Sequence, residues 1–183
     1  MPKKASSYKV GCAIDFETSG YEAYRSCALG MTRIENGVIG ESYYTLIRPP
    51  AGEVLFSHIH CLTWDDLKDA PTFREVWPNI AEFLKGVDFL VAHNAPFDRK
   101  VYYASLEKFE LTPIRLPFLC TLKGSRRAFK ELRSKTLDVV CRHLNIHLDN
   151  HHHAASDALA CANIYLRLKA LGITDNFMRL NDI

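Results

Sequence analysis

Hydrophobic positions recur along the chain at two spacings, every second residue and every third or fourth, which predict strands and helices respectively. Alternation and short apolar runs predict strands near residues 8–16, 25–35, 38–47, 87–92 and 117–121. Helical spacing predicts helices near residues 63–69, 72–85, 96–108, 124–131, 135–144 and 154–171. Three meandering strands followed by alternating helices and strands predict an α/β fold, with a mixed five-stranded β-sheet and α-helices on both faces.

The first predicted strand ends with two acidic residues on one face. In KVGCAIDFE, one face carries Val10, Cys12, Ile14 and Phe16, and the other carries Gly11, Ala13, Asp15 and Glu17. The small residues let a helix or a ligand approach, so the carboxylates of Asp15 and Glu17 are expected to be shielded from water. Two carboxylates this close are unfavourable unless a cation lies between them. The alternative is a solvated turn at the end of a strand.

Two further acidic residues, Asp98 and Asp157, are predicted in helices. Asp98 falls in the first turn of a helix that starts after Asn94, where it could also simply complement the helix dipole. Asp157 shares a helical stripe with four residues, Ala160, Cys161, Ile164 and Leu168. An acid on such a buried face is costly unless it is paired or binds a metal, and that face offers no Lys or Arg. We therefore expect Asp157 to be a metal ligand.

His152 lies just before the last helix, where a loop can place its ring over whatever Asp157 binds. With an unperturbed pKa near 6.5, an imidazole is the side chain best suited to take a proton from water at neutral pH. The alternative is a surface histidine in a run of three. His151 and His153 are weaker candidates for the same role. Oxygen ligands for hard cations together with one titratable imidazole are what a two-metal phosphodiesterase site requires.

Three segments, DFETSG, HNAPFD and HHHAASDA, resemble the exonuclease motifs of the DEDD superfamily, in its histidine branch, DEDDh. That branch includes the proofreading epsilon subunit of bacterial DNA polymerase III, ribonuclease T and oligoribonuclease. The resemblance spans about residues 8–171 and implies a ribonuclease H-like fold. It implies that Asp15, Glu17 and Asp157 hold a first metal ion, that Asp15 also holds a second, and that Asp98 supports the second through water. His152 stands at the position of the family's general base.

The resemblance implies a 3′-to-5′ exonuclease that releases nucleoside 5′-monophosphates from nucleic-acid ends by a two-metal mechanism. Mg²⁺ or Mn²⁺ suits an all-oxygen ligand set better than zinc does. DNA is favoured as the substrate. One alternative is a 3′-5′ exoribonuclease of the same family. Another, from a different class, is a catalytically silent module that binds nucleic-acid ends, although all five catalytic positions are filled.

A zinc hydrolase is a rival interpretation. His143, His147 and His151 recur every fourth residue and would share a face if one helix continued through all three. The intervening LNIHLDN, with Asn145 and Asn150, is typical of the end of a helix. The spacing alone therefore supports this rival weakly.

Seven residues are candidates for substrate binding. The resemblance nominates Phe16, Thr18, Ile59, His60 and Asn94, although Ile59 could instead be a core residue and His60 a loop histidine. Arg126 and Arg127 belong to a basic cluster that neutralises phosphates or forms a solvated helix face. That cluster comprises Lys123, Arg126, Arg127, Lys130, Arg133 and Lys135. The formal net charge of the whole chain is only +2.

Length and composition predict one enzyme domain over residues 8–172, with a flexible tail at 1–7 and a C-terminal tail at 173–183. No stretch has the pattern of a signal peptide or a membrane span, so we expect a cytoplasmic protein with no membrane partner. The six cysteines are expected to be reduced and mostly buried. The chain ends soon after its last long helix, which indicates a stand-alone enzyme without a polymerase partner, as a monomer or homodimer.

Overall fold

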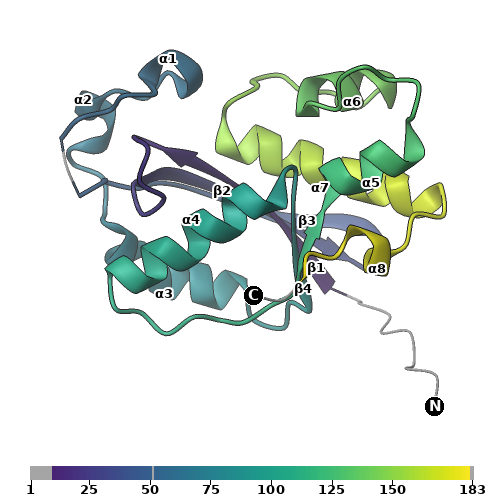
Figure 1. Ribbon diagram of the computed structural model, residues 1–183. Coiled ribbons are helices and arrows are strands. Elements are labelled where there is room, and N and C mark those ends of the chain that lie inside the picture. The colour runs from purple at the N-terminus through teal and green to yellow at the C-terminus, as the bar shows by residue number, and fades with distance from the viewer. Residues whose placement is uncertain (1–9, 51, 182–183) are drawn as a thin grey trace.

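Five strands form one mixed sheet at the centre of the protein (Figure 1). The structure, a computed structural model, describes residues 10–50 and 52–181. The strand order is β3-β2-β1-β4-β5, with bounds β1 Val10–Thr18, β2 Ser26–Glu35, β3 Val38–Leu46, β4 Phe89–Ala92 and β5 Phe118–Cys120. The first three strands are antiparallel, whereas β4 pairs parallel with β1 and β5 parallel with β4. The five-stranded mixed sheet is as predicted.

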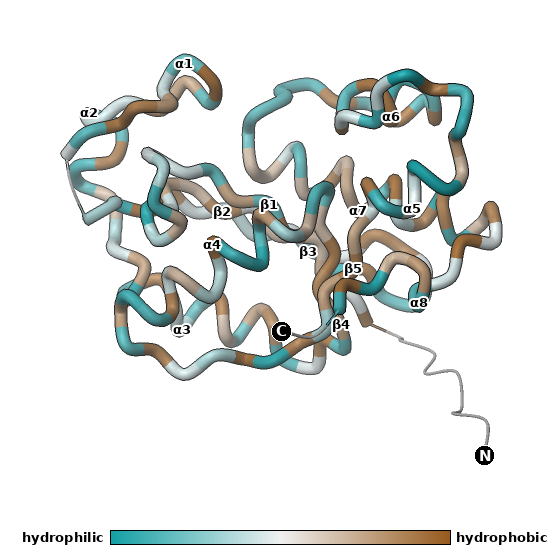
Figure 2. The backbone as a smooth tube through the Cα atoms, in the orientation of Figure 1, coloured by the Kyte–Doolittle hydropathy of each residue, from teal (hydrophilic) through white to brown (hydrophobic). Residues whose placement is uncertain are grey.

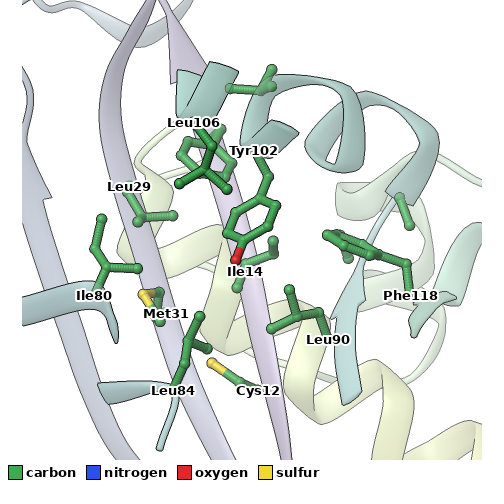
Figure 3. Close-up of a cluster of buried hydrophobic side chains, with 14 of the residues drawn as sticks. Cys12, Ile14, Leu29, Met31, Ile80, Leu84, Leu90, Tyr102, Leu106 and Phe118 are labelled. Carbon is green, nitrogen blue, oxygen red and sulfur yellow. The ribbon is translucent and has the colours of Figure 1, made fainter. Parts of the chain in front are cut away.

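Helices cover both faces of the sheet, as the sequence predicts (Figure 1). Their bounds are α1 Ser57–His60, α2 Trp64–Leu67, α3 Phe73–Phe83, α4 Ala95–Lys108, α5 Thr121–Ala128, α6 Leu137–His143, α7 Ala154–Ala170 and α8 Asp175–Met178. One apolar core lies between the sheet and α3 and α4, where Tyr102 and Leu106 pack against Ile14 and Leu90 (Figure 3). The other lies beneath α5 to α8, around Ile164. Two cores separated by one sheet make a three-layer domain.

The central strand β1 separates the two cores because its side chains alternate between them. Cys12, Ile14 and Phe16 are buried in the core beneath α4, and Ala13 is buried in the core beneath α7. Gly30 pairs with the end of β1, and a Cβ at that position would lie 2.1 Å from the carbonyl oxygen of Ala154. Glycine thus lets the N-terminus of α7 rest directly on the sheet.

The sequence missed two short helices, α1 and α8, and placed the start of α5 about three residues late. The second of these helices falls in residues 173–183, for which the sequence predicts a C-terminal tail. There Met178 is fully buried, and the backbone N–H of Leu180 donates to the carbonyl of Phe118 at 2.8 Å. Four-residue helices are too short for a periodic pattern, so tertiary contacts define this segment. The predicted tail at residues 1–7 lies outside the described residues.

All six cysteines are free, in agreement with the predicted reduced state. Five of them are buried, in agreement with the prediction that most are, and Cys61 is exposed. It follows α1 with a positive φ of 61°, which ends that helix and turns the residue outward. Within residues 10–50 and 52–181, no helix is long and apolar enough to cross a membrane.

Candidate active site

Three carboxylates from two elements converge at the end of the central strand. Asp15 and Glu17 lie near the C-terminal end of β1, and Asp157 lies in the first turn of α7. One carboxylate oxygen from each lies within 4.8 Å of the other two. The close approach of α7 to the sheet at Gly30 brings Asp157 over β1. Residues separated by about 140 positions therefore share one site.

Asp98 completes the acidic group from the other side of β1. It is 2% exposed, and its Oδ1 accepts a hydrogen bond of 3.1 Å from the backbone N–H of Phe16. Since Phe16 stands between Asp15 and Glu17, this bond fixes the first turn of α4 against the acidic end of β1. The structure thus brings together all four carboxylates that the sequence singled out.

The four acids are held where their charges are unfavourable. Burial, followed by the charges of Asp98, Glu17 and Asp157, raises the pKa of Asp15 well above its usual range. Burial, with further contributions from Asp157 and Asp98, raises the pKa of Glu17 to about 8. Burial raises the pKa of Asp98 to about 8 despite the hydrogen bond from Phe16, and raises that of Asp157 to about 6. A bound cation would remove this cost.

The donor set fits a hard divalent cation. Every candidate ligand of Asp15, Glu17, Asp98 and Asp157 is a carboxylate oxygen, which is the chemistry that Mg²⁺ and Mn²⁺ prefer. In addition, Oδ1 of Asp157 is buried and has no hydrogen-bond partner among the described residues. A buried carboxylate oxygen without a partner is costly, and a metal ion would satisfy it.

His152 lies directly beside Asp157. Its backbone N–H donates to Oδ2 of Asp157 at 2.9 Å, and its φ of 69° is in the left-handed region, which few non-glycine residues adopt. Its ring stacks on that of His151, with centroids 3.9 Å apart. Burial, followed by the charge of His151, lowers the pKa of His152 despite the opposing effect of Asp157. The imidazole is therefore neutral at pH 7 and able to accept a proton.

The other two histidines of the run have different surroundings. His151 lines the same cavity as His152. His153 is the residue before α7, and its ring stacks on Tyr44 with centroids 4.6 Å apart. It is absent from the cavity lining among the described residues. This geometry favours His152 over His153 as the base.

A cavity of about 730 Å³ opens over the acidic residues. Its walls include Asn94 and Phe97 from the start of α4, and Leu122 and Arg126 from α5. The connection from α5 to α6 contributes further lining residues, Arg133, Ser134, Lys135 and Thr136. Figure 2 shows this connection as mostly hydrophilic, with apolar positions between the hydrophilic ones. The cavity thus combines a carboxylate end with basic walls.

The predicted substrate-binding residues separate into two groups. Phe16, Asn94 and Arg126 line the cavity. Thr18, Ile59, His60 and Arg127 do not appear in its lining among the described residues. The guanidinium of Arg127 instead lies over the ring of Phe177, 5.7 Å from its centroid. Arg127 thus lies outside the cavity lining, and a role for Arg127 or Thr18 in substrate binding stays a prediction.

His60 and Ile59 lie on α1. Nε2 of the buried His60 is 3.2 Å from the carbonyl oxygen of Thr18 and 3.7 Å from Sγ of Cys27. Ile59 is 41% exposed. His60 thus ties α1 to the end of β1, and the exposed Ile59 remains available for contact with a ligand. A role for either residue in substrate binding stays a prediction.

Sequence reasoning missed His93, which also lines the cavity. Its Nε2 lies 2.8 Å from the carbonyl oxygen of Lys135, and its Nδ1 lies 2.9 Å from Oγ1 of Thr121. A carbonyl only accepts, so Nε2 carries the proton and Nδ1 accepts from Thr121. His93 therefore anchors the basic α5–α6 connection to the end of β4. The sequence offered one indication of this role, namely that His93 directly precedes the candidate substrate-binding residue Asn94.

The structure excludes the rival zinc centre. α6 ends at His143, and Asn145 follows with a left-handed φ of 52°. His147 pairs instead with Asp149 at 2.5 Å. His143, His147 and His151 therefore do not share one helix face.

Comparison with known proteins assigns the chain to a family. A family model described as exonuclease (RNase_T) matches residues 12–165. The DNA polymerase III subunit epsilon of Aquifex aeolicus is 30% identical over 160 residues, which cover 85% of this chain and 78% of the relative. The chain belongs to the exonuclease family. A PolC-type DNA polymerase III from Caldanaerobacter subterraneus is 34% identical over 159 residues, but this chain spans only 11% of that relative's length.

Solved structures of exonucleases share the fold. The nuclease domain of 3′hExo, described as a DEDDh family member bound to rAMP, superposes with a TM-score of 0.77 at 19% identity, covering 97% of this chain and 98% of that one. Exonuclease X in complex with 5′ overhanging duplex DNA gives a TM-score of 0.71 at 23% identity, covering 92% and 96%. The predicted ribonuclease H-like fold is confirmed, and so is membership of the exonuclease family.

Proposed function

We propose that this exonuclease-family protein is a 3′-to-5′ exonuclease that hydrolyses phosphodiester bonds at nucleic-acid 3′ ends, with DNA as the preferred substrate. The observation that carries the proposal is that Asp15, Glu17 and Asp157 meet beside the neutral imidazole of His152 in one cavity. Asp98 adds a fourth carboxylate next to them, bound to the backbone of Phe16. The basic walls of the cavity match a polyanionic substrate. The epsilon and PolC names of the relatives support DNA as the substrate.

Two Mg²⁺ or Mn²⁺ ions are the proposed cofactors. Asp15, Glu17 and Asp157 would hold the first, and Asp15 with Asp98 would hold the second, Asp98 acting through water. Such ions acidify a bound water and stabilise the negative charge that develops on the phosphate and the leaving oxygen. The orphaned Oδ1 of Asp157 and the raised pKa values of the acids support this assignment.

His152 is the proposed general base. Its ring is neutral at pH 7, and the bond from its backbone to Asp157 fixes the loop that carries it. The left-handed φ of His152 is a local strain that the surrounding contacts maintain, as is common at functional sites. In this proposal the imidazole accepts the proton of the attacking water and passes it to solvent.

The residues proposed to bind the substrate lie in the cavity walls. Arg126, Arg133 and Lys135 would neutralise backbone phosphates, while Phe16 and Asn94 would contact the terminal nucleotide. His93 holds the connection that carries Arg133 and Lys135. The basic residues would contact the backbone without reading the sequence, which suits an enzyme that removes successive nucleotides of any base.

The proposal is tested with 5′-labelled single-stranded DNA and RNA of one sequence, incubated with Mg²⁺ or Mn²⁺. Wild type is expected to give ladders that shorten from the 3′ end, faster on DNA than on RNA. Asp15→Asn, which keeps the side-chain volume and removes the charge, is expected to abolish shortening. Asp65→Asn is the matched control, because Asp65 is an exposed residue of α2.

Three outcomes would contradict parts of the proposal. Equal activity of wild type and Asp15→Asn would show that the activity does not come from this site. Faster shortening of RNA would replace DNA by RNA as the preferred substrate. Tight binding of 3′ ends by the wild type without any shortening would favour the catalytically silent end-binding module.

A further inference from the structure

His151, His152 and Asp157 form a second group of metal-ligand atoms at the edge of the acidic cluster. One ligand atom from each lies within 4.8 Å of the other two. The two imidazole rings are stacked, with centroids 3.9 Å apart and an interplanar angle of 16°. Two ligands of a tetrahedral zinc ion, each about 2.0–2.1 Å from the metal, stand roughly 3.3 Å apart. The ligand atoms of the group are thus close enough for one ion to bind them, once a ring turns out of the stack so that its nitrogen points at the ion.

Asp157 supplies an unpartnered oxygen to this group. The residue is 4% exposed, its Oδ2 is taken by the backbone N–H of His152, and its Oδ1 has no hydrogen-bond partner among the described residues. The bond to Oδ2 also fixes the carboxylate relative to the histidine loop. This fixed, buried and unsatisfied oxygen also lies beside two imidazoles, so a cation that binds it can recruit them as well as the carboxylates.

The donor chemistry of this group differs from that of the four carboxylates. Two imidazole nitrogens and one carboxylate oxygen are a ligand set typical of zinc sites that keep a fourth position open. Mg²⁺ and Mn²⁺ prefer oxygen ligands. His151 is the residue that makes the difference, since the DEDDh roles carried over to this chain use His152 and Asp157 without it.

We propose that His151, His152 and Asp157 form a zinc-binding site that overlaps the catalytic centre and inhibits the enzyme when zinc binds. Its inhibitory consequence rests on the proposed function, whereas the binding itself does not. A zinc ion held there occupies the ring nitrogen of His152 that would accept the proton of water. It also takes an oxygen of Asp157 away from the first catalytic metal.

Metal binding by the full chain tests the site directly. Zn²⁺ affinity is measured by competition with a chromogenic chelator, and Mn²⁺ affinity by the electron paramagnetic resonance signal of free Mn²⁺. His151→Ala is expected to weaken Zn²⁺ binding at least about tenfold, since even indirect partners of metal ligands contribute 10–100-fold. Mn²⁺ affinity is expected to stay within about twofold, because the carboxylates are intact.

The matched control is His147→Ala, because His147 is an exposed histidine of the same α6–α7 connection that lies outside the group. It is expected to bind both ions like wild type. Zn²⁺ affinity of His151→Ala within about threefold of wild type would overturn the site. Equal losses of Zn²⁺ and Mn²⁺ binding in that variant would overturn its selectivity.

Inhibition is then measured at saturating Mg²⁺, with each variant compared with its own zinc-free rate. Wild type and His147→Ala are expected to lose activity at a Zn²⁺ concentration about tenfold lower than His151→Ala requires. Equal sensitivity of all three proteins would overturn the inhibitory role. Absence of nuclease activity in the wild type would contradict the proposed function. The zinc site would then be tested by the Zn²⁺ and Mn²⁺ affinities alone.

Discussion

Replacing Glu17 by Gln in the metal-free protein is expected to raise the free energy of unfolding at alkaline pH. Glu17 has a pKa raised from 4.5 to about 8 in the folded protein. The stability associated with its proton is fully present below pH 4.5 and is lost as the pH rises through about 8. Each pKa unit corresponds to about 1.36 kcal/mol, so charging Glu17 costs at most about 5 kcal/mol. We expect roughly half of this, about 2–3 kcal/mol, because the cavity relaxes and admits water.

The assay is urea unfolding in EDTA at pH 4.5 and pH 8.5, followed by circular dichroism. The Glu17→Gln variant is expected to be about 2–3 kcal/mol more stable than wild type at pH 8.5 and about equal to it at pH 4.5. Glu41→Gln, at an exposed position of β3, is the control and is expected to match wild type at both pH values. At pH 8.5, Mn²⁺ at a hundred times its Kd is expected to stabilise wild type by about 2.7 kcal/mol. An equal difference between Glu17→Gln and wild type at both pH values would refute the reasoning.

Three further variants test the base, the loop anchor and the helix approach. His152→Ala is expected to lower kcat by about 10² or more. In the wild type, kcat is expected to fall with decreasing pH only below pH 6.5, because the pKa of His152 is lowered. An unchanged kcat in His152→Ala would exclude His152 as the base. His93→Ala is expected to raise KM for DNA more than it lowers kcat, and a loss confined to kcat would contradict its anchoring role. Gly30→Ala is expected to destabilise the fold by about 1–3 kcal/mol, whereas Gly40→Ala, with ordinary contacts, serves as its near-neutral control in urea unfolding.

The acidic site could be predicted because each acid breaks a local pattern. Asp15 and Glu17 occupy the face of β1 that otherwise carries small residues, and Asp157 interrupts the apolar stripe of α7. A charge at such a position needs a compensating partner, so the pattern indicates a cation before any coordinates are known. The strand alternation also predicted which side of the sheet would carry the site.

Some features could not be predicted from the sequence, because they depend on contacts between distant residues or on the exact rotation of a helix about its axis. The role of His93 arises from the carbonyl of Lys135, a contact across 42 positions that no local pattern encodes. Arg126 and Arg127 are adjacent and chemically identical, and only the helix phase of α5 directs one of them into the cavity. The short helix α8 forms because Met178 finds a buried site on α5 and β5, which depends on tertiary packing.

The central claim is that carboxylates from β1, α4 and α7 jointly hold divalent ions. The most direct test is anomalous diffraction at the manganese edge from crystals grown with Mn²⁺. Two peaks are expected, one contacted by Asp15, Glu17 and Asp157 and the other next to Asp15 on the side of Asp98. Manganese absent from this end of β1, with the acids paired to arginines instead, would contradict the account.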